Sequence, residues 1–348
     1  METQNTTKKK RGLKIALIVL AVVIVLVLAA VIFGASMFSR IRQNIIPTVK
    51  NPDRESVANL ATPSAEMFDE ALRTDIDYYE TGEIAEVPIY AQDKIDKYTL
   101  TMAIVVQQGK LDSEPRQTDM IFLASYNQLQ QKLSIVALPR DMLLPTHEYG
   151  WKRVGAIYAT GGLGLLINTV NDCFGLGIQN YVYTGTEELA QLADAVNGVP
   201  ATLTEAEAAN INQQTGSSLS AGKNRLSGSQ AICYLSDRVS DSKGDMGRAE
   251  KQLALIEETF WYLTDNFDRE YLVPLFTKIF NCIRTNMEWD TLFDLGYEVA
   301  VANELSFVTI RIPFDDSYSE IAYENAYSIL PEIEKNKILL QQILFGKE

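Results

Sequence analysis

The chain has 348 residues, of which 47% are apolar and 22% charged, and its formal net charge is −14. This length and composition allow a sizeable core and exclude a disordered chain. Residues 1–14 contribute +4, so the remainder carries −18, which argues against a nucleic-acid partner because phosphate binding depends on dense Lys and Arg coverage.

Residues Ile15–Phe33 form a run of nineteen positions without a charged or strongly polar side chain. A helix of this length spans roughly 28 Å, close to the hydrocarbon thickness of a bilayer. A cleaved signal peptide and a buried helix are the alternatives, but signal-peptide apolar regions are usually shorter and Ala35–Ser36 is a weak cleavage site. We therefore expect a transmembrane helix over residues 15–38.

The residues before this run set the expected orientation. Four consecutive basic residues, 8–11, and Lys14 precede it, and such clusters stay on the cytoplasmic side. We expect a cytoplasmic basic tail over residues 1–14 and a single-pass protein of the cell membrane. The main domain is then extracellular.

Residues 39–97 are predicted to form an extracellular stalk and lead-in, because they are polar and contain four prolines. One helix is plausible there, near Ala65–Arg73. From Tyr98 onward the sequence alternates between short apolar runs and amphipathic segments, which indicates a folded domain over residues 98–348.

Elements of two kinds follow one another in the first part of this domain. Continuous β-branched and apolar runs predict buried strands, and capping residues or glycines mark the helix ends. The predicted strands are Leu100–Val106, Met120–Ser125, Leu133–Leu138 and Tyr181–Thr184; the predicted helices are Val154–Thr160, ending at Gly161–Gly162, then Leu165–Phe174 and Thr186–Gly198.

The second part continues the alternation. Thr204 and Ser227 open capping boxes, and a long helix begins near Asp245, with apolar residues at helical spacing facing a core. A strand is predicted over Phe307–Ile312, and Ala326–Leu344 is predicted to be mostly helix. Strands alternating with helices indicate an α/β fold. We predict a three-layer α/β/α domain with a central mixed β-sheet, preceded by one transmembrane helix.

Two familiar enzyme signals fail on inspection. His147 is the single histidine, so a zinc site or a Ser-His-Asp triad would depend on it alone, and a surface histidine is the simpler interpretation. Residues 216–224 (GSSLSAGKN) approach a phosphate-binding loop, but five residues separate the glycines and Asn224 replaces Ser or Thr.

Basic residues next to predicted strand ends are more informative. Ligands of α/β sheets bind in loops at strand ends, and the planar fork of arginine suits phosphate. The simpler alternative is that each arginine pairs with its neighbouring aspartate on the surface. The residues concerned are Arg116, Arg140, Arg153, Arg238 and Arg248.

The start of the long helix carries a local conflict. Arg248, Lys251 and Gln252 have spacings that place them on one helix face. Two cations in the first turns oppose the helix dipole unless an anion binds there. The helix start is therefore a candidate anion site.

These segments together resemble the LytR-CpsA-Psr family of bacterial membrane-anchored enzymes, which move glycopolymers from a polyprenyl-pyrophosphate carrier onto peptidoglycan. The resemblance covers residues 98–348 and the N-terminal anchor. The segments that carry it are 116–120 (RQTDM), 140–142 (RDM), 153–162 (RVGAIYATGG), 179–184 (QNYVYT), 193–203 (ADAVNGVPATL), 226–238 (LSGSQAICYLSDR) and 244–252 (GDMGRAEKQ).

The resemblance implies a role for individual residues. Asp119 matches a catalytic aspartate linked to Mg²⁺, so it is the predicted metal ligand of a weakened magnesium site. The arginines Arg140, Arg238 and Arg248 match residues that grip the pyrophosphate, and with Asp119 they form the predicted catalytic set. The predicted substrate-binding residues are Arg116, Arg153, Asp245, Lys251 and Gln252, with Asp245 a structural partner of the arginines.

The chain also departs from the family pattern. Ser236 stands where an arginine is usual, and Gln107 is predicted to replace a carboxylate that joins the magnesium site. Met142 and Gly155 replace a threonine and an asparagine. Loss of one charged contact to a buried pyrophosphate costs about 1.5–3 kcal/mol.

Two functions of different classes follow. The first is a phosphotransferase that moves a teichoic acid, a capsular or another anionic polysaccharide from its polyprenyl-pyrophosphate carrier to peptidoglycan at the membrane. The second is a catalytically impaired relative that binds the lipid-linked polymer or regulates an active paralogue. The retained charged set favours the first, and Gln107 and Ser236 favour the second.

Overall fold

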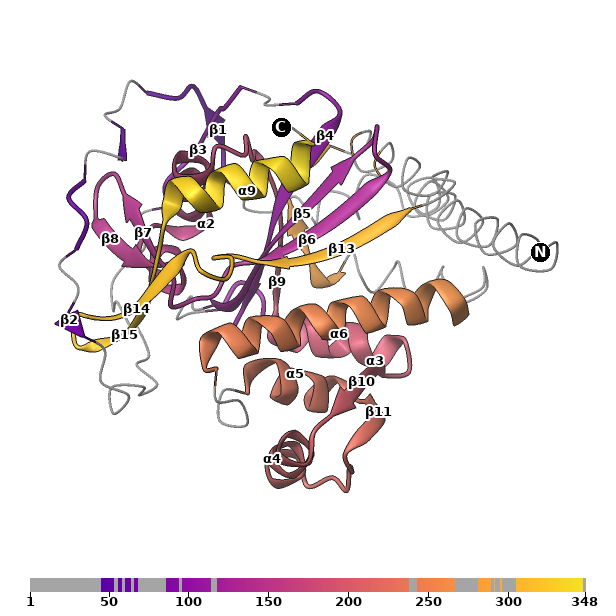
Figure 1. Cartoon of the computed structure of the whole chain (residues 1–348). Helices are drawn as coiled ribbons and strands as arrows, with labels where there is room; N and C mark the ends of the chain where they lie inside the picture. Colours follow the sequence, from indigo (N-terminus) through magenta and orange to yellow (C-terminus); the bar gives the residue numbers. More distant parts are fainter. Residues whose placement is uncertain are drawn as a thin grey trace, which may run out of the picture.

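Runs of β-branched and other apolar residues form a central six-stranded sheet in the computed structural model (Figure 1). Its strand order is β12–β9–β4–β5–β6–β13. The pairs β9–β4 and β6–β13 are parallel and the other neighbours are antiparallel, so the sheet is mixed, as predicted. The strands are β4 (Thr99–Gln107), β5 (Thr118–Asn127), β6 (Lys132–Ala137), β9 (Asn180–Gly185), β12 (Arg284–Thr285) and β13 (Ser306–Arg311).

The structure describes residues 45–52, 56–57, 60–63, 66–67, 86–93, 96–113, 118–237, 243–266, 281–288, 291, 295 and 305–346. Within these ranges, no helix is both long enough and apolar enough to cross a bilayer. The predicted tail over residues 1–14 and the predicted transmembrane helix over residues 15–38 lie outside the described residues. Both stay predictions.

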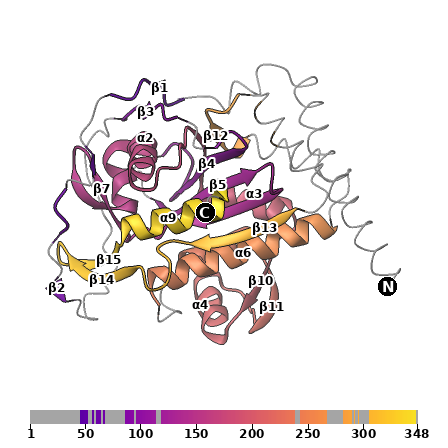
Figure 2. The same ribbon diagram turned by 45° about the horizontal axis from the view of Figure 1, so that its top comes forward.

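Helices cover both faces of the sheet, which gives three layers (Figure 2). Alternating residues of β5 divide between two cores: Ile121 and Leu123 pack toward α2 and α9, whereas Met120 and Phe122 pack toward α3, α5 and α6. The helices are α2 (Val154–Phe174), α3 (Thr186–Ala195), α4 (Glu205–Thr215), α5 (Gly228–Ser236), α6 (Asp245–Asn266) and α9 (Ile333–Phe345).

Four smaller sheets accompany these layers within the described residues. They are β1 (Thr48–Val49) with β3 (Ile89–Tyr90), β7 (Leu143–Thr146) with β8 (Gly150–Arg153), β10 (Val199–Leu203) with β11 (Gly222–Leu226), and β15 (Ala326–Pro331) with β14 (Tyr318–Tyr323) and β2 (Glu66–Met67). The capping boxes predicted at Thr204 and Ser227 are present at the starts of α4 and α5.

Described parts of the lead-in lie against the domain. Ile46 and Ile89 are buried in the core on the α2 side of the sheet, and Asn168 of α2 hydrogen-bonds the backbone at Pro88 and Tyr90. Where the predicted helix near residues 65–73 is described, Glu66–Met67 is instead a strand that pairs with β14. The rest of that prediction lies outside the described residues, and the boundary at residue 98 stays a prediction.

Two further helix predictions have different outcomes. The helices predicted over 154–160 and 165–174 are present as the two parts of α2, and the predicted break at Gly161–Gly162 is confirmed by non-helical backbone at both glycines. The prediction of helix from Ala326 is wrong for its first six residues, because β15 pairs antiparallel with β14 through a turn at Glu324 and Asn325. Strand pairing overrides the helical pattern there, and helix begins only at Ile333.

Candidate functional site

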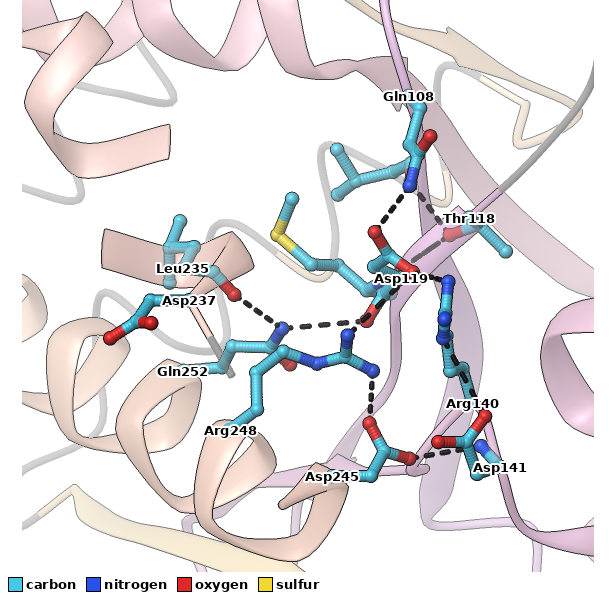
Figure 3. A network of polar contacts seen from close by, with 12 residues as sticks. Gln108, Thr118, Asp119, Arg140, Asp141, Leu235, Asp237, Asp245, Arg248 and Gln252 are labelled. Atoms are coloured by element: carbon cyan, nitrogen blue, oxygen red, sulfur yellow. Dashed lines mark hydrogen bonds and ion pairs between the residues drawn. The ribbon is translucent and has the colours of Figure 1, made fainter. Parts of the chain in front are cut away.

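Asp119 lies at the start of β5 and is the centre of a buried polar cluster (Figure 3). The side chain of Arg140, which follows β6, donates from Nη1 to Asp119 Oδ1 at 2.6 Å. Nη1 of Arg248, in the first turn of α6, lies 3.7 Å from the same oxygen. Two strand ends and one helix start therefore bring together three of the four predicted catalytic residues.

The ionisation of Asp119 follows from these neighbours. Burial alone raises the pKa of its carboxyl, but the positive charges of Arg140 and Arg248 and a hydrogen bond from Gln108 outweigh burial. The pKa of Asp119 is held below its ordinary value. The same carboxylate, with Asp141 and Asp245, raises the pKa of Arg140 despite its burial. Asp119 is therefore ionised at neutral pH.

Asp245 fastens α6 to the loop after β6. Its Oδ1 accepts a hydrogen bond from Arg248, and its Oδ2 accepts from the backbone N–H of Asp141 at 2.9 Å (Figure 3). The pair Asp245–Arg248 also places an acidic residue at the helix start, which suits the dipole. This is the structural partnership predicted for Asp245.

Asp141 is a member of the cluster that the sequence interpretation missed. Burial and the adjacent charge of Asp245 raise the pKa of Asp141 to about 7, against the opposing effect of the nearby arginines. Its position directly after Arg140 was the available signal, since that neighbour must sit in the same loop. Three carboxylates and two guanidiniums thus share one buried region.

Gln252 links three elements. Its Nε2 donates to the backbone carbonyl of Leu235 in α5 at 3.1 Å and approaches that of Asp119 at 3.4 Å. The side chain is buried, one turn after Arg248 on α6. Gln252 therefore lies beside the cluster, and its role in substrate binding stays a prediction.

The glutamine that faces Asp119 is Gln108, not Gln107. Gln108 Nε2 donates to Asp119 Oδ2 (Figure 3). Gln107 is fully buried on the other side, where its Oε1 accepts from Tyr183 and its Nε2 donates to the backbone of Lys110 and Ser113. A register shift between Val106 and Gln107 explains the difference, because a bulge moves the following side chains by one position. Gln108 is therefore the amide in the place predicted for Gln107.

Two predicted substrate-binding cations point elsewhere. Arg153 donates to the backbone carbonyls of Tyr327 and Ala326, each at 3.2 Å, and holds the β14–β15 turn. Lys251 donates to Asp237, at 3.0 Å to the carbonyl and 3.1 Å to the carboxylate. Consequently Lys251 does not share the direction of Arg248 and Gln252, and its charge is balanced within the protein.

The remaining predicted residues can be placed more briefly. Arg116 and Arg238 lie outside the described residues. Ser236 is exposed at the last position of α5. Gly155 has a packing reason for its departure, since a Cβ there would lie 3.1 Å from Cβ of Arg140 and 3.3 Å from the carbonyl of Thr118. His147 pairs with Asp172 at 3.2 Å on a different part of the fold.

One hydrogen-bond donor of the cluster has no acceptor among the described residues. Nη1 of Arg248 is buried, and within the described part of the chain it makes no hydrogen bond. The whole side chain is 1% exposed. Leaving a buried donor without an acceptor costs about 1–3 kcal/mol, and more when the donor belongs to a charged group. Binding of an anionic oxygen next to Nη1 of Arg248 is therefore favoured.

A resident Mg²⁺ fits the same residues poorly. Magnesium takes oxygen ligands, commonly one or two carboxylates with waters and substrate phosphates. Both oxygens of Asp119 already accept hydrogen bonds, and two guanidiniums lie beside it. Among the residues that the structure describes, no three His, Cys, Asp or Glu side chains gather as metal ligands. The magnesium site stays a prediction.

The fold and the site define a class of protein: a mixed α/β domain whose buried arginines, at a strand end and at a helix start, are suited to binding an anionic group. The profile of the LytR_cpsA_psr family matches residues 65–341. The chain belongs to this family, as its motifs predicted.

Named relatives and a solved structure extend the comparison. The chain is 24% identical over 302 residues to the polyisoprenyl-teichoic acid–peptidoglycan teichoic acid transferase TagU of Enterococcus faecalis, covering 86% of this chain and 87% of the relative. It is 25% identical over 236 residues to the regulatory protein MsrR of Staphylococcus aureus, covering 67% and 70%. A structure of the LytR-CPS2A-psr family protein YwtF (TagT) with bound octaprenyl pyrophosphate lipid superposes with a TM-score of 0.55 at 16% identity, covering 73% of this chain and 94% of that one. At this identity the structure confirms the fold.

Proposed function

We propose that this protein transfers a glycopolymer from a polyprenyl-pyrophosphate carrier to peptidoglycan during cell-wall biogenesis. One observation carries the proposal: Arg248 presents a buried, unsatisfied Nη1 donor beside the Asp119–Arg140 pair. A pyrophosphate oxygen would satisfy that donor. Family membership and the transferase name of the TagU relative support the same reaction.

The apolar surroundings support a lipid-linked substrate. Met120, Leu235, Ala249 and Leu253 belong to the core between the sheet and α3, α5 and α6. Two of them directly follow site residues, Asp119 and Arg248, along the chain. An isoprenoid chain needs apolar lining next to a polar headgroup site, and on this side of the sheet apolar residues lie beside the cluster, packed in the core.

The proposed reaction divides between positioning and charge stabilisation. An acceptor hydroxyl of peptidoglycan attacks the phosphorus nearest the glycan, and the bond from that phosphorus to the bridging oxygen breaks. Polyprenyl phosphate leaves. Arg140 and Arg248 stabilise the negative charge that develops on the phosphate oxygens. The hydroxyl proton ends on the departing polyprenyl phosphate, and the ionised Asp119 holds Arg140 and Arg248 in place.

No step above depends on a magnesium ion, which the residues around Asp119 fit poorly. The proposal also places the domain outside the cell, anchored by residues 15–38, because lipid-linked polymer and peptidoglycan meet at the outer face of the membrane. The proposed polymer is an anionic glycan of the teichoic or capsular class.

Matched charge variants test the proposal. Arg248→Gln and Asp119→Asn, in the full-length chain in detergent, should lower transfer of labelled lipid-linked polymer to peptidoglycan by about 10- to 100-fold, since each removes a buried charged contact. Lys243→Gln removes one exposed cation near the same helix start, where it pairs with Glu250, and should leave transfer unchanged. Equal loss in Arg248→Gln and Lys243→Gln would contradict the proposed site.

A second function has one specific observation in its favour. An amide, Gln108, faces Asp119 where the family pattern has a carboxylate, and one relative is named a regulatory protein. A protein that binds lipid-linked polymer without turnover would bind the substrate normally and transfer nothing. Binding without transfer, across teichoic and capsular substrates, would establish this alternative.

A further inference from the structure

The contacts of Gln108 bear on how the pyrophosphate is held, an inference that rests on the proposed function. Gln108 occupies one oxygen of Asp119 through a single N–H of its terminal amide. An amide nitrogen carries two hydrogens, so a second donor is left for a ligand. Arg140 occupies the other oxygen of Asp119. Each oxygen of the carboxylate thereby accepts a hydrogen bond.

The unsatisfied group in the site is a donor rather than an acceptor. Nη1 of Arg248 is buried without a hydrogen bond from the described residues, 3.7 Å from Asp119 Oδ1. A phosphate oxygen completes this arrangement directly. A divalent cation instead has to compete with Gln108 and Arg140 for the oxygens of Asp119 and lie next to two guanidiniums, which like-charge repulsion disfavours.

We propose that this site binds the pyrophosphate of its substrate without a divalent metal ion, through Arg140, Arg248 and Gln108, and that residue 108 sets this metal independence. The amide at 108 adds no negative charge beside Asp119. A carboxylate at the same place creates a pair of acidic groups that repel the phosphates unless a cation lies between them. The chemistry recognised is a pyrophosphate ester.

Charge in the rest of the cluster is compatible with this binding. Arg248 is balanced by Asp245, and Asp141 lies next to Asp245 in the loop after β6. Because burial and Asp245 favour the protonated form of Asp141, with its pKa near 7, the cluster carries less negative charge than three carboxylates suggest. An incoming anion therefore meets less repulsion.

Binding measurements with a defined probe test the inference. The full-length chain in detergent micelles is titrated with geranylgeranyl pyrophosphate by calorimetry, in excess EDTA and in excess Mg²⁺. The dissociation constant is expected to agree within about threefold between the two conditions. Mg²⁺ alone is expected to leave the melting temperature of the wild type unchanged.

Two matched variants isolate residue 108. Gln108→Asp introduces a carboxylate, and we expect it to weaken binding in EDTA by about tenfold or more, with recovery in Mg²⁺. Gln108→Asn has the same length without the charge and is expected to stay independent of metal. Circular dichroism checks that both variants fold. If Gln108→Asp does not fold, Gln108→Glu introduces a carboxylate at the same position instead.

The outcomes separate this inference from the proposed function. Binding by the wild type that disappears in EDTA overturns metal independence while leaving the transferase proposal intact. Metal-independent binding by both carboxylate variants overturns the role of residue 108. Absence of binding under every condition removes support from the proposed function and from this inference together.

Discussion

Replacing Asp141 by asparagine should change how the stability of the fold depends on pH. Asp141 is 8% exposed, and Asp245 accepts a hydrogen bond from its backbone N–H at 2.9 Å. Burial and the charge of Asp245 together raise the pKa of Asp141 from an ordinary value of 3.8 to about 7, although Arg140 and Arg248 oppose them. The folded state therefore holds a proton that the unfolded chain releases.

The sign of the effect follows from that difference. The stability contributed by this proton is fully present below about pH 4 and is lost as the pH rises through about 7. At about 1.4 kcal/mol per pKa unit, the free energy of unfolding falls by up to about 4 kcal/mol across this window. Asparagine has nearly the same shape and cannot ionise, so the variant lacks this loss.

Urea denaturation of the full-length chain in detergent, followed by tryptophan fluorescence, measures the effect. The quantity to plot is the unfolding free energy of Asp141→Asn minus that of the wild type, from about pH 4.5 to about pH 8. Subtraction removes other groups, such as Asp119, whose lowered pKa makes its contribution fade only as the pH falls. The difference should increase with pH and level off above about 7.5.

A constant difference across this range would refute the reasoning, because it would mean that Asp141 has the same pKa in both states. Asp245→Asn provides the matching control. Removing the charge of Asp245 should shift the transition to lower pH, since that charge is the second largest cause of the raised pKa. Burial then raises the pKa of Asp141 against the opposing charges of the nearby arginines.

Local patterns predicted the strands and helix starts of this fold well. The apolar runs of β4, β5 and β6 differ from the predicted ranges by one or two residues at each end, and both capping boxes formed. The β14–β15 hairpin was missed because its turn uses Glu324 and Asn325, both at positive φ, in place of the usual Asn-Gly. Its second strand is fixed by pairing partners that are distant in sequence.

The site residues likewise divide into those that could be placed from the sequence and those that could not. Asp119, Arg140 and Arg248 could be placed together because each lies at a strand end or a helix start, and these positions follow from the fold. Arg153 and Lys251 could not be placed, since long side chains reach several partners and tertiary packing decides among them. The bulge that exchanges Gln107 for Gln108 likewise has no clear local signal.

Two further predictions concern residues that pack the fold outside the site. Arg153→Met should lower the unfolding free energy by about 3 kcal/mol in denaturant titrations, because it leaves buried carbonyls of the β14–β15 hairpin without their charged donor, while Lys152→Met should change it little. Pyrophosphate affinity of the folded Arg153→Met protein should stay within about twofold; a tenfold loss would restore the substrate-binding interpretation. The second prediction concerns Gly164→Ala and the sign of its effect on the unfolding free energy. In an unobstructed helix interior this change stabilises by about 1 kcal/mol. Here the added Cβ would lie 1.8 Å from the carbonyl oxygen of Val87, so the lead-in must move, and we expect a loss of about 1–3 kcal/mol. A melting temperature above that of the wild type would show that residues 86–90 do not cross α2 at this glycine.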